Sequence, residues 1–276
     1  MKIIRKIISY ILAIILVTLM SATIILSIVN AVVFSKSNVK KQMQKVNYYT
    51  EINNIIKESA NNYIMQSGFD ESIMENVISK EKISNDIDKV IDSIYEGEDV
   101  EISTDEIKVN LDKNVQQYIS QNNYKVDAQT QKDITKFEDK IESIYANSIT
   151  YSKSTIKKVV KYFKMAKRMT MVALIASSFL LIIFAIITYK TYRASFGISL
   201  LATGAICIFI KCYSSINIAV NNILMVNKTF SNLVINIVNQ VIQYIFISGI
   251  ILAILGIVLI IFFERKNANK KYDENI

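Results

Sequence analysis

Acidic residues divide this 276-residue chain into two parts that differ in chemistry. Of its 24 Asp and Glu residues, all but Glu264, Asp273 and Glu274 lie between residues 51 and 142. The long stretch over residues 143–263 contains none. Such a stretch is typical of polypeptide in contact with lipid, because a charge inside a bilayer is costly. The distribution therefore predicts an acidic, water-facing part and a membrane part.

Four apolar runs, over residues 7–34, 169–189, 196–213 and 241–263, suit membrane-spanning helices. A span needs about 20 mostly apolar residues to cross roughly 30 Å of hydrocarbon. The third run is short and contains Lys211, whose side chain can reach the interface. For the first run a cleaved signal peptide is the alternative. We favour a retained helix, because the run exceeds the roughly 7–15 residues of a signal-peptide core.

Basic residues predict how the spans are oriented, because they gather in short cytoplasmic loops. The connection over 214–240 contains only Lys228. The opposite ends of the spans are flanked by Lys2, Arg5, Lys6, Lys190, Arg193, Arg265, Lys266, Lys270 and Lys271. We therefore expect a plasma-membrane protein with a cytoplasmic N-terminus (1–6), loop (190–195) and tail (264–276). Residues 35–168 and 214–240 would then lie outside.

Hydrophobic periodicity predicts that the outer segment is helical. Apolar residues recur at steps of three and four over 39–63, 83–95, 107–119 and 134–145, as on helices with one buried face. The first helix is expected to continue from the first span to Gly68. Asp70 and Asp127 are expected to cap later helices, and Ser103 and Glu106 to form a capping box.

The connection over 214–240 also keeps helical apolar spacing, which predicts a helical hairpin that turns near residues 227–228. The fold class expected is an all-α integral membrane protein with four transmembrane helices. A helical extracytoplasmic domain, residues 35–168, is inserted between the first and second of them.

Few residues offer catalytic or metal-binding chemistry. The chain has no His, which removes the Ser-His-Asp and His-based zinc arrangements. Its two cysteines share the third span at a spacing of five, which suits neither a redox pair nor a metal motif. Asp86, Asp88 and Asp92 leave a carboxylate-only hypothesis. The acidic turn over 96–101 leaves a Ca²⁺ hypothesis, against which we favour a solvated turn. We therefore predict no catalytic, metal or cofactor site, and no enzyme.

Basic residues flank the acidic segment on both sides. We interpret them as a belt that faces anionic headgroups or an acidic partner, the alternative being ordinary solvated flanks. The members of this belt are Lys36, Lys40, Lys41, Lys45, Lys153, Lys157, Lys158, Lys161, Lys164, Lys167 and Arg168. Nucleic-acid binding is not expected, because the pI of about 9.2 arises from membrane flanks and not from a basic domain.

Small residues on the third and fourth spans predict a helix-packing seam, formed by Ser199, Thr203, Gly249, Ala253 and Gly256. The favoured function is a non-enzymatic scaffold, sensor or assembly protein. Its outer domain would bind a protein, a cell-envelope partner or a second copy of the chain. An oligomeric channel or a subunit of a transport complex is the alternative. The spans contain no carboxylate of the kind that ion-coupled transport uses.

Overall fold

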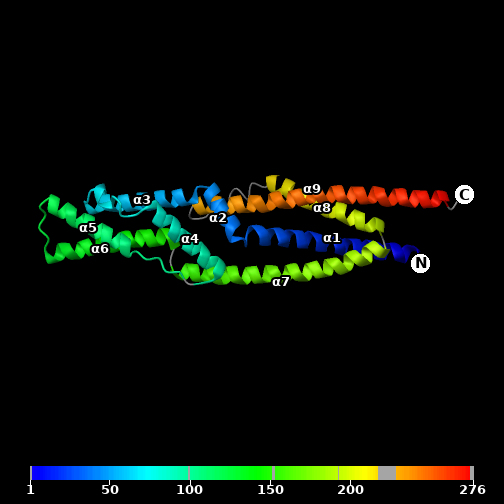
Figure 1. Ribbon diagram of the computed structural model, residues 1–276, viewed down its shortest axis with the longest axis horizontal. Coiled ribbons are helices and arrows are strands. Elements are labelled where there is room, and N and C mark those ends of the chain that lie inside the picture. The colour runs from blue at the N-terminus through cyan, green and yellow to red at the C-terminus, as the bar shows by residue number, and fades with distance from the viewer. Residues whose placement is uncertain (1, 99, 151–152, 192, 217–227, 274–276) are drawn as a thin grey trace. The chain divides into compact units, whose positions relative to one another are not determined.

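The computed structural model describes residues 2–98, 100–150, 153–191, 193–216 and 228–273 (Figure 1). These residues form helices and no strand. Four of the described helices are long and apolar enough to cross a membrane, over Ile7–Val32, Lys158–Tyr189, Ser195–Ser214 and Lys228–Arg265. The prediction of an all-helical chain with four candidate spans is confirmed. The extracytoplasmic position of the intervening segment stays a prediction.

The chain forms two compact units. The first, Met1–Val39 with Ala166–Ile276, contains α1 (Lys2–Val32), α8 (Arg193–Ile216), α9 (Lys228–Asp273) and the C-terminal part of α7 (Lys153–Thr191). Helices α8 and α9 pack along each other, and α1 packs against both (Figure 1). Leu16, Met20 and Leu200 form a buried cluster. Large apolar side chains remain exposed along α7, as expected for a surface that faces lipid.

Glycines bring the backbones of α8 and α9 into contact. A Cβ atom on Gly204 would lie 2.6 Å from the backbone nitrogen of Ala253 and 2.6 Å from the carbonyl oxygen of Gly249. A Cβ atom on Gly256 would lie 2.6 Å from the backbone nitrogen of Leu201. Close approach of this kind favours helix association in lipid, where dispersion contacts replace the hydrophobic effect. Any larger side chain at these glycines would force the two helices apart.

The second unit, Lys40–Met165, has a core of its own. It contains most of α2 (Lys36–Lys45), then α3 (Tyr48–Ser67), the short 3₁₀ helix η1 (Glu71–Met74), α4 (Lys80–Glu96), α5 (Asp105–Gln121) and α6 (Ala128–Thr150). Helix α6 packs against α3, α4 and α5. The predicted apolar faces meet there. The side chains that are at most 1% exposed include Ile52, Ile56, Ile64, Ile83, Ile107, Leu111 and Ile141.

Three predicted helix-end signals are confirmed. Gly68 ends α3 with a φ of 78°, a conformation that glycine adopts without strain. Asp70 accepts a hydrogen bond from the Ser72 backbone nitrogen at 2.9 Å, and Asp127 accepts one from the Thr130 backbone nitrogen at 2.7 Å. Each signal acts within a few residues, so the local sequence suffices to identify it.

The predicted capping box at the start of α5 is wrong. Thr104, and not Ser103, is the residue before the helix, and its side chain makes no cap hydrogen bond. The Ser103 hydroxyl instead donates to Asp105 Oδ2 at 2.9 Å, and the Thr104 hydroxyl donates to Glu142 Oε2 at 2.6 Å. The Ser103 hydroxyl also accepts a hydrogen bond from the Asp105 backbone nitrogen at 3.3 Å, so a local bond from Ser103 and a contact of Thr104 with α6 together hold the start of α5.

The predicted continuous helix from the first span to Gly68 is also wrong. Helix α1 ends at Val32, whose carbonyl oxygen accepts a hydrogen bond from Asn38 Nδ2 at 2.9 Å. Asn47 has a φ of 54° and separates α2 from α3. Asparagine tolerates this left-handed conformation better than most residues. The predicted turn of the 214–240 hairpin lies partly outside the described residues, which omit 217–227.

Candidate functional site

A buried ionic network links α4 to α6. The Asp86 carboxylate is 1% exposed and accepts a hydrogen bond from the Tyr145 hydroxyl at 2.7 Å. Lys82 and Lys89, one turn to either side on α4, place their Nζ atoms 3.2 and 3.0 Å from the two oxygens of Asp86. Burial by itself raises the pKa of Asp86, but the hydrogen bonds from Tyr145, Lys89 and Lys82 outweigh it and hold that pKa below its usual range.

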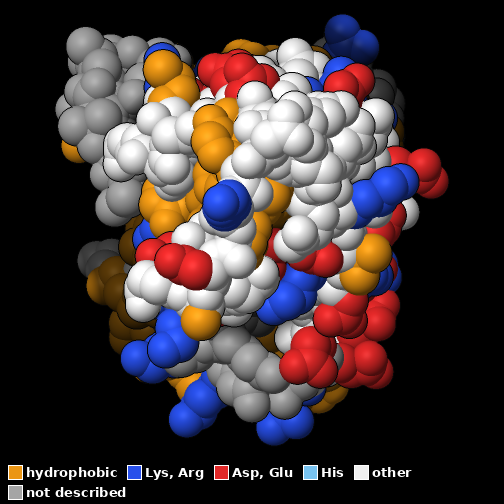
Figure 2. Space-filling model, turned by 90° about the vertical axis from the view of Figure 1, so that its left-hand side faces the viewer, with side chains coloured by type: hydrophobic (Ala, Val, Ile, Leu, Met, Phe, Trp, Pro, Cys, Tyr) orange, Lys and Arg blue, Asp and Glu red, His pale blue; other side chains and the backbone are white. Residues whose placement is uncertain are grey.

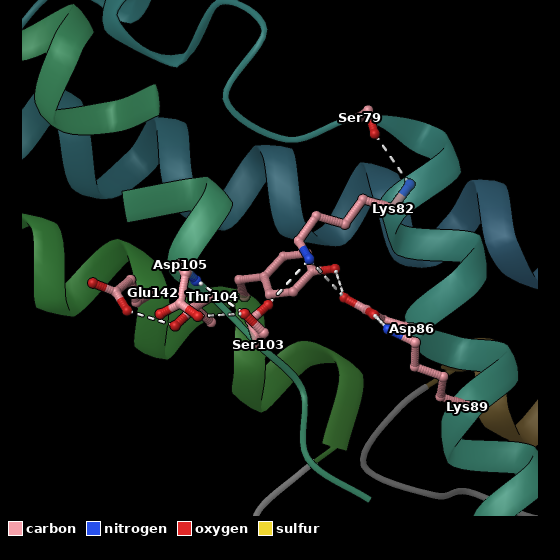
Figure 3. Close-up of polar contacts among 9 residues, drawn as sticks. Ser79, Lys82, Asp86, Lys89, Ser103, Thr104, Asp105 and Glu142 are labelled. Atoms are coloured by element: carbon pink, nitrogen blue, oxygen red, sulfur yellow. Dashed lines mark hydrogen bonds and ion pairs between the residues drawn. The ribbon is translucent and has the colours of Figure 1, made fainter. Parts of the chain in front are cut away.

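Lys82 also reaches the segment before α5. Lys82 Nζ donates to the Ser103 carbonyl oxygen at 3.0 Å and lies 5.7 Å from the centre of the Tyr145 ring. Figure 3 shows Lys82 and Asp86 extending from α4 toward this segment. Burial, together with the bond to Asp86, raises the pKa of the Tyr145 hydroxyl well above its usual range. Tyr145 is therefore a neutral hydrogen-bond donor, and the network ties α4, α6 and the start of α5 together.

The other two acids of the carboxylate hypothesis contact different partners. Lys40 Nζ lies 3.1 Å from Asp88 Oδ2 and 2.9 Å from Asp92 Oδ1. The Tyr49 hydroxyl donates to Asp88 Oδ1 at 2.7 Å. Asp86 therefore contacts α6, whereas Asp88 contacts α2 and α3 and Asp92 contacts α2. The three carboxylates do not converge on one position, and their contacts hold helices together.

A lysine contacts the acidic turn that follows α4. Gly97 has a φ of 78°, and its carbonyl oxygen accepts a hydrogen bond from Lys164 Nζ at 3.1 Å. The Ser93 hydroxyl donates to the Glu98 carbonyl oxygen at 2.5 Å. Among the described residues, which omit Asp99, no group of three or more potential metal ligands comes together. The geometry of the turn is that of a helix end closed by a cation from α7.

The predicted basic belt consists of residues in different situations. Lys40 is bound by two carboxylates and Lys164 by a carbonyl oxygen. Lys36 also has an interaction partner, and Lys167 is half-buried. Besides Lys164, the exposed members are Lys41, Lys45, Lys158, Lys161 and Arg168. The side chains of Lys153 and Lys157 lie outside the described residues. Part of the belt thus acts within the helical unit itself.

The predicted seam residues divide between two contacts. Gly249 and Gly256, with Ala253 between them, lie against α8. Ser199 and Thr203 instead lie beside α1, where their hydroxyls approach the Ala13 carbonyl oxygen at 3.4 Å and Met20 Sδ at 3.7 Å. Both hydroxyls also donate one turn back along α8, at 2.8 Å. Each of these residues is in a helix–helix contact of the first unit.

One buried carboxyl group lacks a cation of its own. Glu138 on α6 is 5% exposed, and its Oε1 atom has no hydrogen-bond partner among the described residues. Lys108, whose positive charge acts to lower the pKa of Glu138, pairs with Asp139 and Glu142 at 3.3 Å each. Burial, and then the neighbouring charge of Asp112, raise the pKa of Glu138 to about 7. The group therefore titrates near neutral pH.

Two adjoining grooves flank η1. The larger has a volume of about 440 Å³, and its wall carries four amides (Asn76, Asn114, Gln117 and Gln121), the Glu75 carboxylate and the Tyr118 ring. The smaller has a volume of about 370 Å³ and includes Lys57 and Asn61. Both grooves contain Ser72 and Glu75, so they meet at η1.

Sequence reasoning missed these grooves and placed Tyr118 in the apolar face of α5. The available signal is a second stripe on the same helix, in which Asn114, Gln117, Tyr118 and Gln121 follow at three- and four-residue steps. No protein-family model, curated protein or solved structure matches this chain.

Proposed function

We propose that this chain is a non-enzymatic, multi-pass plasma-membrane protein whose helical unit, residues 40–165, lies outside the cytoplasm as a binding module. Its ligand would be a component of the cell envelope or a partner protein. One observation carries the proposal: a compact unit with its own core lies in the chain between two helices that are long and apolar enough to span a membrane. The basic residues of the short loops and termini, read by the positive-inside rule, support an outside position for that unit.

The charged side chains support a binding role over catalysis. Asp86 contacts Lys82 and Tyr145, the second of these on another helix. Lys40 on α2 contacts both Asp88 and Asp92. The charges of these carboxylates therefore stabilise helix packing. A catalytic carboxyl group would instead face a cavity that admits substrate. The tight α8–α9 contact supports a scaffold role for the membrane unit, because backbones in contact leave no space between those two helices.

The orientation is tested by cysteine labelling. Cys207 and Cys212 are replaced by Ala and Ser, and single cysteines are introduced as Lys113→Cys, Lys228→Cys or Lys270→Cys. A membrane-impermeant maleimide on intact cells should label the first two variants, and the third only after permeabilisation. Labelling of Lys113→Cys only after permeabilisation would overturn the proposal.

A further inference from the structure

We propose that the grooves beside η1 bind an uncharged, N-acetylated oligosaccharide strand, of the kind that a cell-envelope polysaccharide presents. This inference rests on the proposed function in one respect, because such a polymer is accessible only to a unit outside the cytoplasm.

The chemistry of the lining supports a ligand rich in hydroxyl and acetamido groups. Each Asn or Gln side chain offers a carbonyl acceptor and an NH₂ donor, so Asn76, Gln117 and Gln121 in the larger groove can bond groups that both donate and accept. The Glu75 carboxylate accepts hydrogen bonds from hydroxyl or amide hydrogens. Acetamido groups and sugar hydroxyls match these side chains in kind.

The same lining disfavours other ligand classes. A site for an apolar small molecule is lined mainly by hydrophobic and aromatic side chains, and this wall carries chiefly amides. A phosphate or carboxylate ligand would meet two carboxylates near the point where the grooves join, Glu75 and Glu71, against one cation of the smaller groove, Lys57. The core of a protein interface is typically apolar, so a polypeptide segment is the poorer match.

Several contacts hold η1 rigid, so that the grooves exist before a ligand binds. Asn114 Nδ2 donates to the carbonyl oxygens of Ile73 and Glu75, at 2.9 Å each. Asn76 adopts a φ of 58°, which turns the chain, and the Ile73 and Val77 side chains on either side are 1% and 2% exposed. A preorganised site loses less conformational entropy on binding. Both N–H groups of Asn114 are used by these two bonds, so its Oδ1 atom is the only part of the amide that could bond a ligand, as an acceptor.

The aromatic ring of Tyr118 adds a surface on which a sugar ring can stack. Tyr118 lines the larger groove, and its ring packs against Phe69 at 5.7 Å and Tyr124 at 6.1 Å between centroids. These neighbours fix the ring, and the axial hydrogens of a pyranose can rest on an aromatic face. Figure 2 views the end of the unit where α5 meets α6, and there hydrophobic side chains lie among uncharged polar surface, with charged side chains beside them.

The two grooves together suit a strand better than a single sugar. Each has a volume within the range of roughly 300–1,000 Å³ that is usual for ligand sites. Because they share Ser72 and Glu75, consecutive sugar units can occupy both sides of η1. The grooves are open, so we expect weak binding, with a Kd on the order of 1 mM for a tetrasaccharide.

Calorimetric titration of the full chain in lipid nanodiscs tests this inference. The probe is a β-1,4-linked N-acetylglucosamine tetrasaccharide, and the matched glucose tetrasaccharide lacks the acetamido groups. We expect the first to bind and the second to bind at least fivefold more weakly. The double variant Gln117→Ala/Gln121→Ala removes two exposed amides from the groove and should weaken binding about tenfold. Gln116→Ala, on the same helix but outside the groove lining, should leave it unchanged.

Tyr118→Phe should retain binding, whereas Tyr118→Ala should abolish it. Because Tyr118 packs against its neighbours, the double amide variant decides the outcome if Tyr118→Ala fails to fold. The inference is overturned if neither tetrasaccharide binds at a sugar concentration about tenfold above the expected Kd. It is equally overturned if the amide variant binds like the wild type, or if a protein partner alone crosslinks to the groove. A failure of this kind leaves the cysteine-labelling result intact, so the two proposals fail separately.

Discussion

Replacing Glu138 by Gln should stabilise the helical unit at neutral pH and remove part of its pH dependence. The pKa of this buried carboxyl group rises from a usual value of 4.5 to about 7 in the folded protein. The charged form is therefore unfavourable in the fold, where the Oε1 atom finds no hydrogen-bond partner in the described part of the chain and Lys108 is paired with Asp139 and Glu142. Gln has nearly the same shape as the protonated acid and does not ionise.

The magnitude follows from linkage. Each pKa unit corresponds to about 1.36 kcal/mol, so the difference of about 2.5 between 4.5 and 7 gives roughly 3.4 kcal/mol. The folded state binds the proton more tightly than the unfolded state, so the free energy of unfolding falls as the pH rises from 4.5 to 7. Stability from this group is complete below 4.5 and lost above 7. Water entry and local relaxation reduce the effect, so we expect a gain of about 2 kcal/mol for the variant at pH 8.

Charged groups around Glu138 contribute to the pKa that a titration would measure. Asp112 and Lys108 act on it from α5, and Asp139 from its own helix. Of the other helices packed on α6, α4 presents Lys82 and Asp86 to Tyr145, which lies two turns further along. Since Asp112 and Glu138 lie close enough to interact, the apparent pKa belongs to the pair.

Hydrogen exchange of the full chain in detergent, corrected for the intrinsic effect of pH, measures this local stability. Peptides from α5 and α6 should exchange faster at pH 8 than at pH 5.5 in the wild type, and Glu138→Gln should remove most of that difference. Glu58→Gln, an exposed acid on α3, is the matched control and should change nothing. Parallel pH profiles for the wild type and Glu138→Gln would refute the reasoning.

Three further substitutions test the packing contacts. Asp86→Ala should destabilise the helical unit by about 3–5 kcal/mol in chemical denaturation, because the half-buried Lys82 ammonium loses its carboxylate and the buried Tyr145 hydroxyl loses its acceptor. Tyr145→Phe should cost only about 1–3 kcal/mol. Gly204→Leu should separate α8 from α9 and lower the thermal stability of the detergent-solubilised protein, while Ile206→Leu on the exposed side of α8 should not. Asn114→Ala should raise hydrogen exchange over residues 71–77, because the Ile73 and Glu75 carbonyls lose their donor.

The residues that end and cap helices show how far local sequence reaches. Gly68, Asp70 and Asp127 act on backbone groups within three residues, and all three predictions are confirmed. Ser103 and Glu106 match the capping-box pattern equally well, yet the box does not form. The Ser103 hydroxyl bonds the Asp105 backbone nitrogen, and contacts from Lys82 and Glu142 hold the rest of the segment. A local pattern loses to tertiary contacts when distant side chains offer stronger, charge-assisted bonds.

The sequence by itself determined the four apolar spans, the amphipathic helices and the separation of acidic from carboxylate-free segments. These features depend on composition and on the 3.6-residue period, which neighbouring residues define. Only the tertiary structure decided that Asp86 bonds Tyr145, 59 residues away, and that Asp88 and Asp92 instead bind Lys40. It also decided that the amides of α5 meet η1 in a groove. Such contacts depend on how helices pack against each other, and the period of one helix carries no information about its partner's register.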